Sequence, residues 1–343
     1  MSLVASAVGA AERAPLPDVI TRLGIGMLVG RTRRSLAGTP PGHEDEFLGA
    51  VGARSIAEHA DAANQQHYEL PPEFFALTLG PRRKYSCCLY PRGDEALAEA
   101  EVAALEQTVA HADLHDGQRV LELGCGWGSL TLFMAARFPA STIVAVSNST
   151  PQRLYIEGRA RELGLDNVTV VTADMNAFSA PGRFDRIVSV EMFEHMSNWR
   201  MLLAKVSAWL EPDGRLFIHV FTHRARSYLF DHGNKADWIA RHFFTGGIMP
   251  SRGLIHRFPD IARVEKEWHW NGRHYQRTAE HWLANFDANV EQVDRILSGV
   301  YGRDARLWRR RWRLFYLATA GLFGHAGGDE WGVSHYLLDR AGR

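Results

Sequence analysis

The sequence predicts a doubly wound α/β fold with a mostly parallel sheet and a helical cap. From residue 119 to residue 220, short apolar runs alternate with amphipathic stretches, which is typical of parallel strands joined by helices. A glycine-rich turn follows the first apolar run, at the place where such sheets bind ligands. The predicted strands are Arg119–Leu123, Thr142–Val146, Val168–Thr172, Asp185–Val190 and Arg215–Val220, and the predicted helices are Ser129–Arg137, Pro151–Leu163 and Met201–Leu210.

The rest of the chain is predicted to cover the carboxyl ends of these strands. Residues 1–115 are expected to form a helical lid, residues 116–220 the ligand-binding core, and residues 221–343 a substrate-side cap with the final sheet strand or strands. In residues 221–278 the apolar residues recur at no regular helical or strand spacing, whereas residues 279–299 and 303–323 each predict one long helix. The tripeptide Pro212-Asp213-Gly214 predicts the turn into the fifth strand.

Composition limits the classes of function. The chain has 343 residues, of which 46% are hydrophobic and 23% charged, enough for a large core with a cap. Its formal net charge is zero, so no nucleic-acid partner is expected. Cys87, Cys88 and Cys125 fit neither a disulfide framework nor a zinc spacing, so no metal is expected. Without a signal-peptide pattern or a long apolar run, we expect a cytoplasmic protein with no integral membrane segment, either monomeric or homodimeric.

The glycine turn runs from Glu122 to Gly128, with glycines at every second position from Gly124. Such a turn allows positive φ and a close approach of a ligand to the backbone. A dinucleotide site is the rival interpretation, but it requires G-x-G-x-x-G and an acidic residue roughly 20 positions later. Ser147 and Asn148 stand there instead, which disfavours NAD.

Asp174 and Met175 follow the third predicted strand. The carboxylate can accept a hydrogen bond from an adenine amino group, and the methionine can cover the ring. Asp174 alone could instead cap a helix. Together with the glycine turn, the pair indicates S-adenosylmethionine as the ligand.

Longer motifs carry a resemblance to a known family. Tyr85-Ser86-Cys87-Cys88, the glycine turn and Phe193-Glu194-His195 resemble the cyclopropane-fatty-acid-synthase-like superfamily of S-adenosylmethionine-dependent methyltransferases. Within it, Leu121–Thr131, Ser189–Met196, residues 243–251 and Glu330–His335 are similar to the coclaurine N-methyltransferase group. The resemblance implies a class I Rossmann-like methyltransferase with a seven-stranded sheet. It also implies S-adenosylmethionine as methyl donor and S-adenosylhomocysteine as product.

The same resemblance implies which residues bind the cofactor. Tyr85 and Ser86 are expected to close over it, and Gly124 and Gly126 to meet its methionine part. Ser147, Asn148 and Gln152 are expected at the ribose and adenine. With Glu122, Asp174 and Met175 these are the predicted cofactor residues. Many methyltransferases have an acidic residue at the end of the second strand for the ribose, and this chain lacks it.

The candidate catalytic groups are three side chains in the segment that follows the fourth predicted strand. Methyl transfer is an in-line displacement, so the enzyme must position the nucleophile, and an amine must first lose its proton. Glu191, Glu194 and His195 are spaced by three and four, so they would share one face if the segment were helical. Two carboxylates at this place would repel each other and raise the pKa of at least one of them, which suits a base that works near neutral pH. Alternatively, the acids satisfy a helix N-terminus and His195 is a packed or supporting residue.

The resemblance also distinguishes amine from lipid chemistry. The cyclopropane synthases hold a bicarbonate as base and have a small residue where this chain has Glu191. The Glu191 side chain would therefore fall into the place of that anion, which favours N-methylation of an amine such as a tetrahydroisoquinoline alkaloid of the coclaurine type. Other bicarbonate-site residues are retained as Glu194, His219 and Tyr275, which keeps methylenation or C-methylation of an unsaturated acyl chain as the alternative. A third alternative is a protein that senses the cofactor without turning it over. Such a protein would need none of the three candidate catalytic groups, which argues against this alternative.

The substrate side is predicted to be aromatic. Phe244, Phe323 and Trp331 lie in segments where the coclaurine group is expected to line its substrate pocket, and His219 and Tyr275 are predicted to join them. Trp331, His219 and Tyr275 could equally be interior residues. In the run 306–313, the rings recur at helical spacing, so we predict buried rings and solvated arginines. The alternative is an arginine patch that binds a lipid headgroup.

Overall fold

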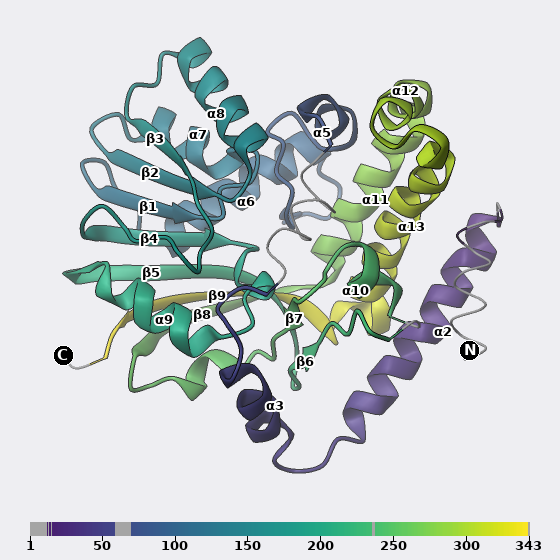
Figure 1. Cartoon of the computed structure of the whole chain (residues 1–343), viewed down its shortest axis with the longest axis horizontal. Helices are drawn as coiled ribbons and strands as arrows, with labels where there is room; N and C mark the ends of the chain where they lie inside the picture. Colours follow the sequence, from purple (N-terminus) through teal and green to yellow (C-terminus); the bar gives the residue numbers. More distant parts are fainter. Residues whose placement is uncertain (1–11, 13, 15, 59–69, 235–236, 342–343) are drawn as a thin grey trace.

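A seven-stranded sheet forms the centre of the computed structural model, which describes residues 12, 14, 16–58, 70–234 and 237–341 (Figure 1). The strand order is β3-β2-β1-β4-β5-β9-β8. Neighbours among the first five strands pair in parallel, whereas β9 pairs antiparallel with β5 and β8. The bounds are β1 Arg119–Leu123, β2 Thr142–Ser147, β3 Val168–Thr172, β4 Phe184–Val190, β5 Leu210–His223, β8 Ala262–Asn271 and β9 Trp331–Arg340. The predicted fold class is confirmed.

All five predicted core strands and all three predicted core helices are present. The helices are α7 Ser129–Arg137, α8 Thr150–Leu163 and α9 Trp199–Ala208. Strand β1 is buried on both faces from Val120 to Leu123, as is typical of a central parallel strand, and this buried stretch includes the carboxyl of Glu122. Helices α7, α8 and α9 contact β2, β3 and β5 respectively, as expected of crossover helices.

The strand order reverses between β1 and β4, where open α/β sheets bind ligands. Gly124 directly follows β1, and Glu191 directly follows β4. Gly124 has a φ of +79°, and a Cβ atom there would lie 2.6 Å from the Met192 side chain. Only glycine therefore lets the two strand ends approach this closely.

The flanking regions supply further helices, several of which gather beyond one end of the strands (Figure 1). Aromatic side chains from α5, α11 and α13, including Phe74, Trp282 and Trp312, pack into a common core. Helix α2 packs against α13. The bounds are α2 Asp18–Ala37, α3 His43–Gly52, α5 Pro72–Thr78, α6 Leu97–His111, α10 Trp238–His242, α11 Arg273–Ala288, α12 Val290–Tyr301 and α13 Ala305–Phe323, with a small hairpin of β6 Tyr228–Leu229 and β7 Ile248–Met249.

The predicted single helix over residues 279–299 is wrong. Two helices, α11 and α12, meet there at Asn289, and α11 begins at Arg273. The Asn289 side-chain amide donates to the carbonyl oxygens of Leu77 at 3.1 Å and Asn285 at 2.9 Å. The break is therefore stabilised by a contact with α5, which the apolar period along the sequence does not reveal.

The predicted turn at residues 212–214 lies inside β5. Leu210 pairs with Phe184, and the next registered pair is Arg215 with Arg186, so the intervening residues bulge from the strand. A Cβ atom on Gly214 would lie 2.8 Å from the carbonyl oxygen of Phe184. The Pro-Asp-Gly signal thus marks a bulge that stays in the sheet.

In the arginine-rich part of α13, the rings behave as predicted and three of the arginines do not. Trp312 and Phe315 are buried, and Trp308 is half-buried and stacks on Tyr301 at 4.5 Å. Arg306 is exposed, whereas Arg309, Arg311 and Arg313 are paired with acids, which weakens the lipid-headgroup alternative. The pairs are Arg309–Asp294, Arg311–Glu12, Arg313–Asp18 and Arg313–Asp287.

Within the described ranges, no helix combines the length and the apolar character needed to cross a membrane.

A substitution at Gly272 tests the close packing at the start of α11. A Cβ atom there would lie 2.2 Å from the carbonyl oxygens of Phe323 and Trp331, which are backbone atoms and cannot rotate away. We expect Gly272→Ala to lower the free energy of unfolding by about 1–3 kcal/mol in urea denaturation. Gly299→Ala is the control, because its Cβ meets open space and a helical alanine stabilises by up to about 1 kcal/mol. Equal stability of the two variants would contradict the packing described.

Candidate active site

A cavity of about 1260 Å³, including its open mouth, lies at the carboxyl ends of β1, β2 and β4. Glu191 and His195 line it, whereas Glu194 and the five residues predicted to bind the substrate do not. All ten predicted cofactor residues line it, namely Tyr85, Ser86, Glu122, Gly124, Gly126, Ser147, Asn148, Gln152, Asp174 and Met175.

The glycine turn leaves the backbone open to a ligand. Gly126 has a φ of +53°, and no atom lies within 4 Å of the place where a Cβ would stand. Behind the turn, the Glu122 carboxyl accepts a hydrogen bond from the Thr131 hydroxyl at 2.5 Å. Burial raises the pKa of Glu122 to about 8.

Three buried polar atoms in the cavity lining fit a ligand rich in hydrogen-bond acceptors. Gln152 Nε2, Trp127 Nε1 and Ser129 Oγ have no hydrogen-bond partner among the described residues. Ser147 Oγ donates to Gln152 Oε1 at 2.7 Å, which leaves the amide nitrogen for a ligand. Buried polar groups without partners are costly, and the hydroxyls and carboxylate of S-adenosylmethionine are suitable partners. Trp127 and Ser129 were not predicted as cofactor residues.

Asp174 combines the two roles considered from the sequence. Its Oδ1 accepts the backbone N–H of Asn176 at 2.6 Å, as in a local cap, and the residue also lines the cavity. Met175 is buried beside it. This position is compatible with the predicted adenine contact.

The carboxyl group of Glu191 has three hydrogen-bonding partners. Oε1 accepts the backbone N–H of Cys87 at 2.9 Å and lies 3.2 Å from His219 Nε2. Oε2 accepts the Tyr275 hydroxyl at 2.6 Å. Burial raises the pKa of Glu191, whereas the positive charge of Lys84 lowers it.

The predicted helical face shared by Glu191, Glu194 and His195 is wrong. Glu191 has a φ of +48°, and its backbone N–H donates to the carbonyl of His219 at 2.8 Å, so pairing of β4 with β5 continues through this residue. Only Phe193–His195 forms a single 3₁₀ turn. Because the strand pairing continues through Glu191, the 3₁₀ turn begins only after this residue, and the Glu191 side chain points toward His219 and Tyr275.

Glu194 and His195 have different environments. Glu194 is 1% exposed, and its Oε2 has no hydrogen-bond partner in the described part of the chain. Burial, and then the charge of Glu191, raise its pKa well above the usual range. His195 stacks on Phe244 at 5.1 Å with an interplanar angle of 3°. Burial lowers the pKa of His195 to about 4, so its imidazole is neutral near pH 7 and can accept a proton.

Lys84 is a functional candidate that sequence reasoning missed. Its side chain is buried, and Nζ donates to Ser86 Oγ at 2.5 Å and to the Cys87 carbonyl at 2.7 Å. The residue lines the cavity and its charge acts on Glu191. A lone lysine in a loop is usually exposed, so its residue type gave no reason to select it. The one signal in the sequence was its position directly before Tyr85-Ser86.

Aromatic rings form a continuous wall from His195 to Tyr275. Phe221 lies 5.7 Å from Phe244 and 6.0 Å from Phe323, and Phe323 stacks on Tyr275 at 4.3 Å. Trp331 is fully buried and donates from Nε1 to the Tyr228 hydroxyl at 3.1 Å, as the interior-residue alternative describes.

The sequence of the whole core matches a known family. The family description for mycolic acid cyclopropane synthetase matches residues 56–325. The chain belongs to this family. It is 37% identical to (S)-coclaurine N-methyltransferase of Thalictrum flavum subsp. glaucum, over 83% of this chain and 80% of that protein. It is 32% identical to cyclopropane-fatty-acyl-phospholipid synthase of Escherichia coli (strain K12), over 76% of this chain and 67% of that protein.

Solved structures agree with this assignment. A crystal structure of coclaurine N-methyltransferase bound to N-methylheliamine and S-adenosylhomocysteine matches with a TM-score of 0.91, 32% identity, and coverage of 98% of this chain and 100% of that one. The cyclopropane synthase MmaA2 from Mycobacterium tuberculosis shares the fold, with a TM-score of 0.70, 23% identity, and coverage of 83% and 99%. The family member described here is an S-adenosylmethionine-dependent N-methyltransferase.

Replacing Asp174 tests its part in cofactor binding. We expect Asp174→Ala to weaken S-adenosylhomocysteine binding about tenfold to a hundredfold, the value of a hydrogen bond to a charged group. Calorimetric titration measures the affinity, and kcat at saturating cofactor should change less. Asp166→Ala is the control, because that carboxylate is exposed before β3 and does not line the cavity. An unchanged affinity in Asp174→Ala would exclude the assigned contact.

Proposed function

We propose that the enzyme methylates the nitrogen of a cyclic aralkylamine of the tetrahydroisoquinoline type. The named relatives support this substrate class, since they include (S)-coclaurine and pavine N-methyltransferases. The observation that carries the proposal is the position of the Glu191 carboxylate. This carboxylate is a side chain of the protein itself, and it hydrogen-bonds with Cys87, His219 and Tyr275 in one pocket.

This pocket argues against lipid methylenation. Its three donors converge on one small region, which is the arrangement that a bound anion requires. Both oxygens of Glu191 occupy those donors. A separate bicarbonate would therefore compete with a carboxylate that is already in place. The matched lipid enzyme is also the more distant of the relatives described above.

The residues of this chain are suited to managing the proton of an amine. When bound, S-adenosylmethionine supplies a methyl group on a positively charged sulfur. An amine arriving as an ammonium must lose a proton before its lone pair can attack. Glu191 lines the cavity and can accept that proton, because burial raises its pKa. The imidazole of His195 also lines the cavity, but burial makes it a weaker base that stays neutral. Glu194, whose pKa is raised, remains protonated beside them as a neutral hydrogen-bonding group.

The aromatic wall suits the remainder of such a substrate. Phe244 and Phe323 flank Phe221 and lie against His195 and Tyr275 respectively. Of this wall only His195 lines the cavity, so an aryl ring or an ammonium in the cavity would meet the wall at the face of this ring, with Phe244 stacked behind it. A flexible acyl chain would not require the stacked His195–Phe244 pair.

A substrate panel tests the proposal directly. The enzyme is incubated with S-adenosylmethionine and, in parallel, with tetrahydroisoquinolines, acyclic amines and vesicles of cis-unsaturated phospholipid. Mass spectrometry should show the gain of one methyl group on the cyclic amines. A gain on unsaturated lipid alone would overturn the proposal. So would calorimetric binding of the cofactor without turnover on the whole amine panel, which would indicate a sensor.

Substitution of the two buried carboxyls tests their role. We expect Glu191→Gln to lower kcat about 10²–10⁴-fold, the usual contribution of general acid–base catalysis, and Glu194→Gln to lower kcat less, because an amide can replace a neutral carboxyl as a hydrogen-bonding group. Cofactor affinity should stay unchanged, because neither change touches the glycine turn. Glu106→Gln, an exposed carboxylate on α6 that pairs with Arg137, is the control and should retain full activity. Near-normal turnover in both buried variants would remove this mechanism.

A further inference from the structure

A chain of hydrogen-bonded histidines leads from Glu191 through the sheet. His219 Nε2 lies 3.2 Å from Glu191 Oε1, and His219 Nδ1 lies 2.8 Å from His335 Nε2. His335 Nδ1 lies 2.8 Å from His111 Nδ1, and His111 Nε2 lies 2.7 Å from the Gln107 side-chain nitrogen. His219 on β5 and His335 on β9 are direct cross-strand partners and fully buried. Each ring thus uses both of its nitrogens in one continuous path.

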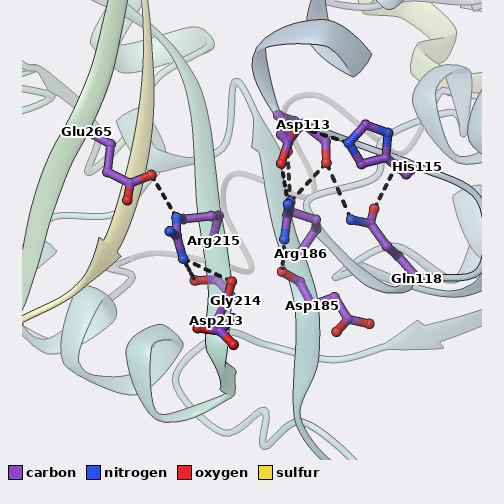
Figure 2. Close-up of polar contacts among 10 residues, drawn as sticks. Asp113, His115, Gln118, Asp185, Arg186, Asp213, Gly214, Arg215 and Glu265 are labelled. Carbon is purple, nitrogen blue, oxygen red and sulfur yellow. Dashed lines mark hydrogen bonds and ion pairs between the residues drawn. The ribbon is translucent and has the colours of Figure 1, made fainter. Parts of the chain in front are cut away.

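The outer end of this path reaches a second cavity. His111, the last residue of α6, is half-buried and lines a cavity of about 580 Å³ near the amino-terminal ends of β4 and β5. The cofactor cavity lies at the opposite ends of these strands. Figure 2 shows the polar wall of the second cavity, where Arg186 pairs with Asp113 and Arg215 with Glu265.

We propose that His219, His335 and His111 form a proton relay between Glu191 and the solvent of the second cavity. The path itself stands on the geometry above. Its purpose rests on the proposed amine methylation, in which the site receives one proton per turnover while substrate and cofactor fill the main cavity.

The hydrogen bonds allow two patterns, because a neutral imidazole has one donor and one acceptor nitrogen. In the first, the donors are Gln107 Nε2, His111 Nδ1, His335 Nε2 and His219 Nε2, each pointing toward Glu191, which is a carboxylate. In the second, every hydrogen bond is reversed. Glu191 is then a carboxylic acid that donates to His219 Nε2, and His111 Nε2–H points outward to the Gln107 amide oxygen after that amide turns.

Passage from the second pattern to the first releases one proton. The O–H bond of Glu191 breaks as an N–H bond forms at His219 Nε2, and His219 Nδ1 passes its proton to His335 Nε2. His335 Nδ1 passes its proton to His111 Nδ1, and the proton of His111 Nε2 goes to water in the second cavity. No electron is transferred, and no imidazole is charged before or after. The carboxylate is thereby restored beneath a filled active site.

The surroundings favour neutral imidazoles. Burial lowers the pKa of His219 and His335 well below the usual range and that of His111 to about 4. A stable imidazolium is therefore disfavoured, which requires the protons to shift together. The other titratable groups that act on Glu191 are Lys84, Cys87, Glu194, His195 and Tyr275, and those that act on the histidines are Lys84 and His269.

Histidine tautomers give a test that does not depend on turnover. The full-length protein, labelled with ¹⁵N-histidine and saturated with S-adenosylhomocysteine, is titrated by NMR while the ¹³C signal of the Glu191 carboxyl is followed. We expect all three rings to exchange tautomers together at the pH where Glu191 titrates, and to stay constant in Glu191→Gln. Rings that keep fixed tautomers through that titration, or that match neither pattern, would overturn the relay whatever substrate the enzyme uses.

Activity gives a second test through the outer residue. We expect His111→Ala to lower kcat for amine methylation about 10–100-fold, with the amine KM and cofactor affinity unchanged. Imidazole added to the buffer should restore kcat, because it can enter the vacated space and take the proton from His335 Nδ1.

The matched control is His115→Ala, an exposed histidine that does not line the second cavity but pairs with Asp113, which does (Figure 2). It should leave kcat unchanged with and without imidazole. A merely structural role of His111 would lower thermal stability and would not respond to imidazole. Wild-type kcat in His111→Ala, or a loss that imidazole does not restore, would therefore overturn the relay.

Discussion

The active site depends on one buried carboxylate, that of Glu191. Its three donors come from separate parts of the chain: Cys87 before α6, His219 on β5 and Tyr275 on α11. Removal of the carboxylate would leave each donor buried without a partner, at about 1–3 kcal/mol for each group. The contact therefore connects lid, sheet and cap, and the close packing at Gly272 places the helix that carries Tyr275.

The same contact separates the roles of two neighbouring acids. Burial raises the pKa of both Glu191 and Glu194, but only Glu191 receives three donors and the nearby charge of Lys84. Glu191 therefore ionises first, and its negative charge keeps Glu194 protonated. In the proposed mechanism, these surroundings make one carboxyl group a base and the other a neutral group, which is a common way to obtain acid and base chemistry from one residue type.

Sequence patterns predicted local features well and long-range pairings poorly. Strands β1 and β3 and helix α7 have the predicted bounds, because buried apolar runs and turn residues are properties of the segment itself. The break at Asn289 and the continued strand pairing of Glu191 both result from contacts with distant segments. His111 and His335 are 224 residues apart, so no spacing rule could have joined them. Several of the predicted cofactor residues, such as Gly124, Asn148 and Asp174, follow the ends of neighbouring strands, which is why the sequence could place them at one cavity.

A base that is part of the chain has a requirement that a bound anion lacks. The resemblance to the cyclopropane synthases implies a bicarbonate, which can exchange with solvent and carry its proton away. In the proposed mechanism Glu191 takes the corresponding place and cannot leave, so its proton must move by another route whenever the cavity is filled. The antiparallel strand β9 places His335 directly opposite His219, and α6 brings His111 to the other side of His335. The fixed base and the path for its proton are thus consistent parts of one arrangement in the sheet.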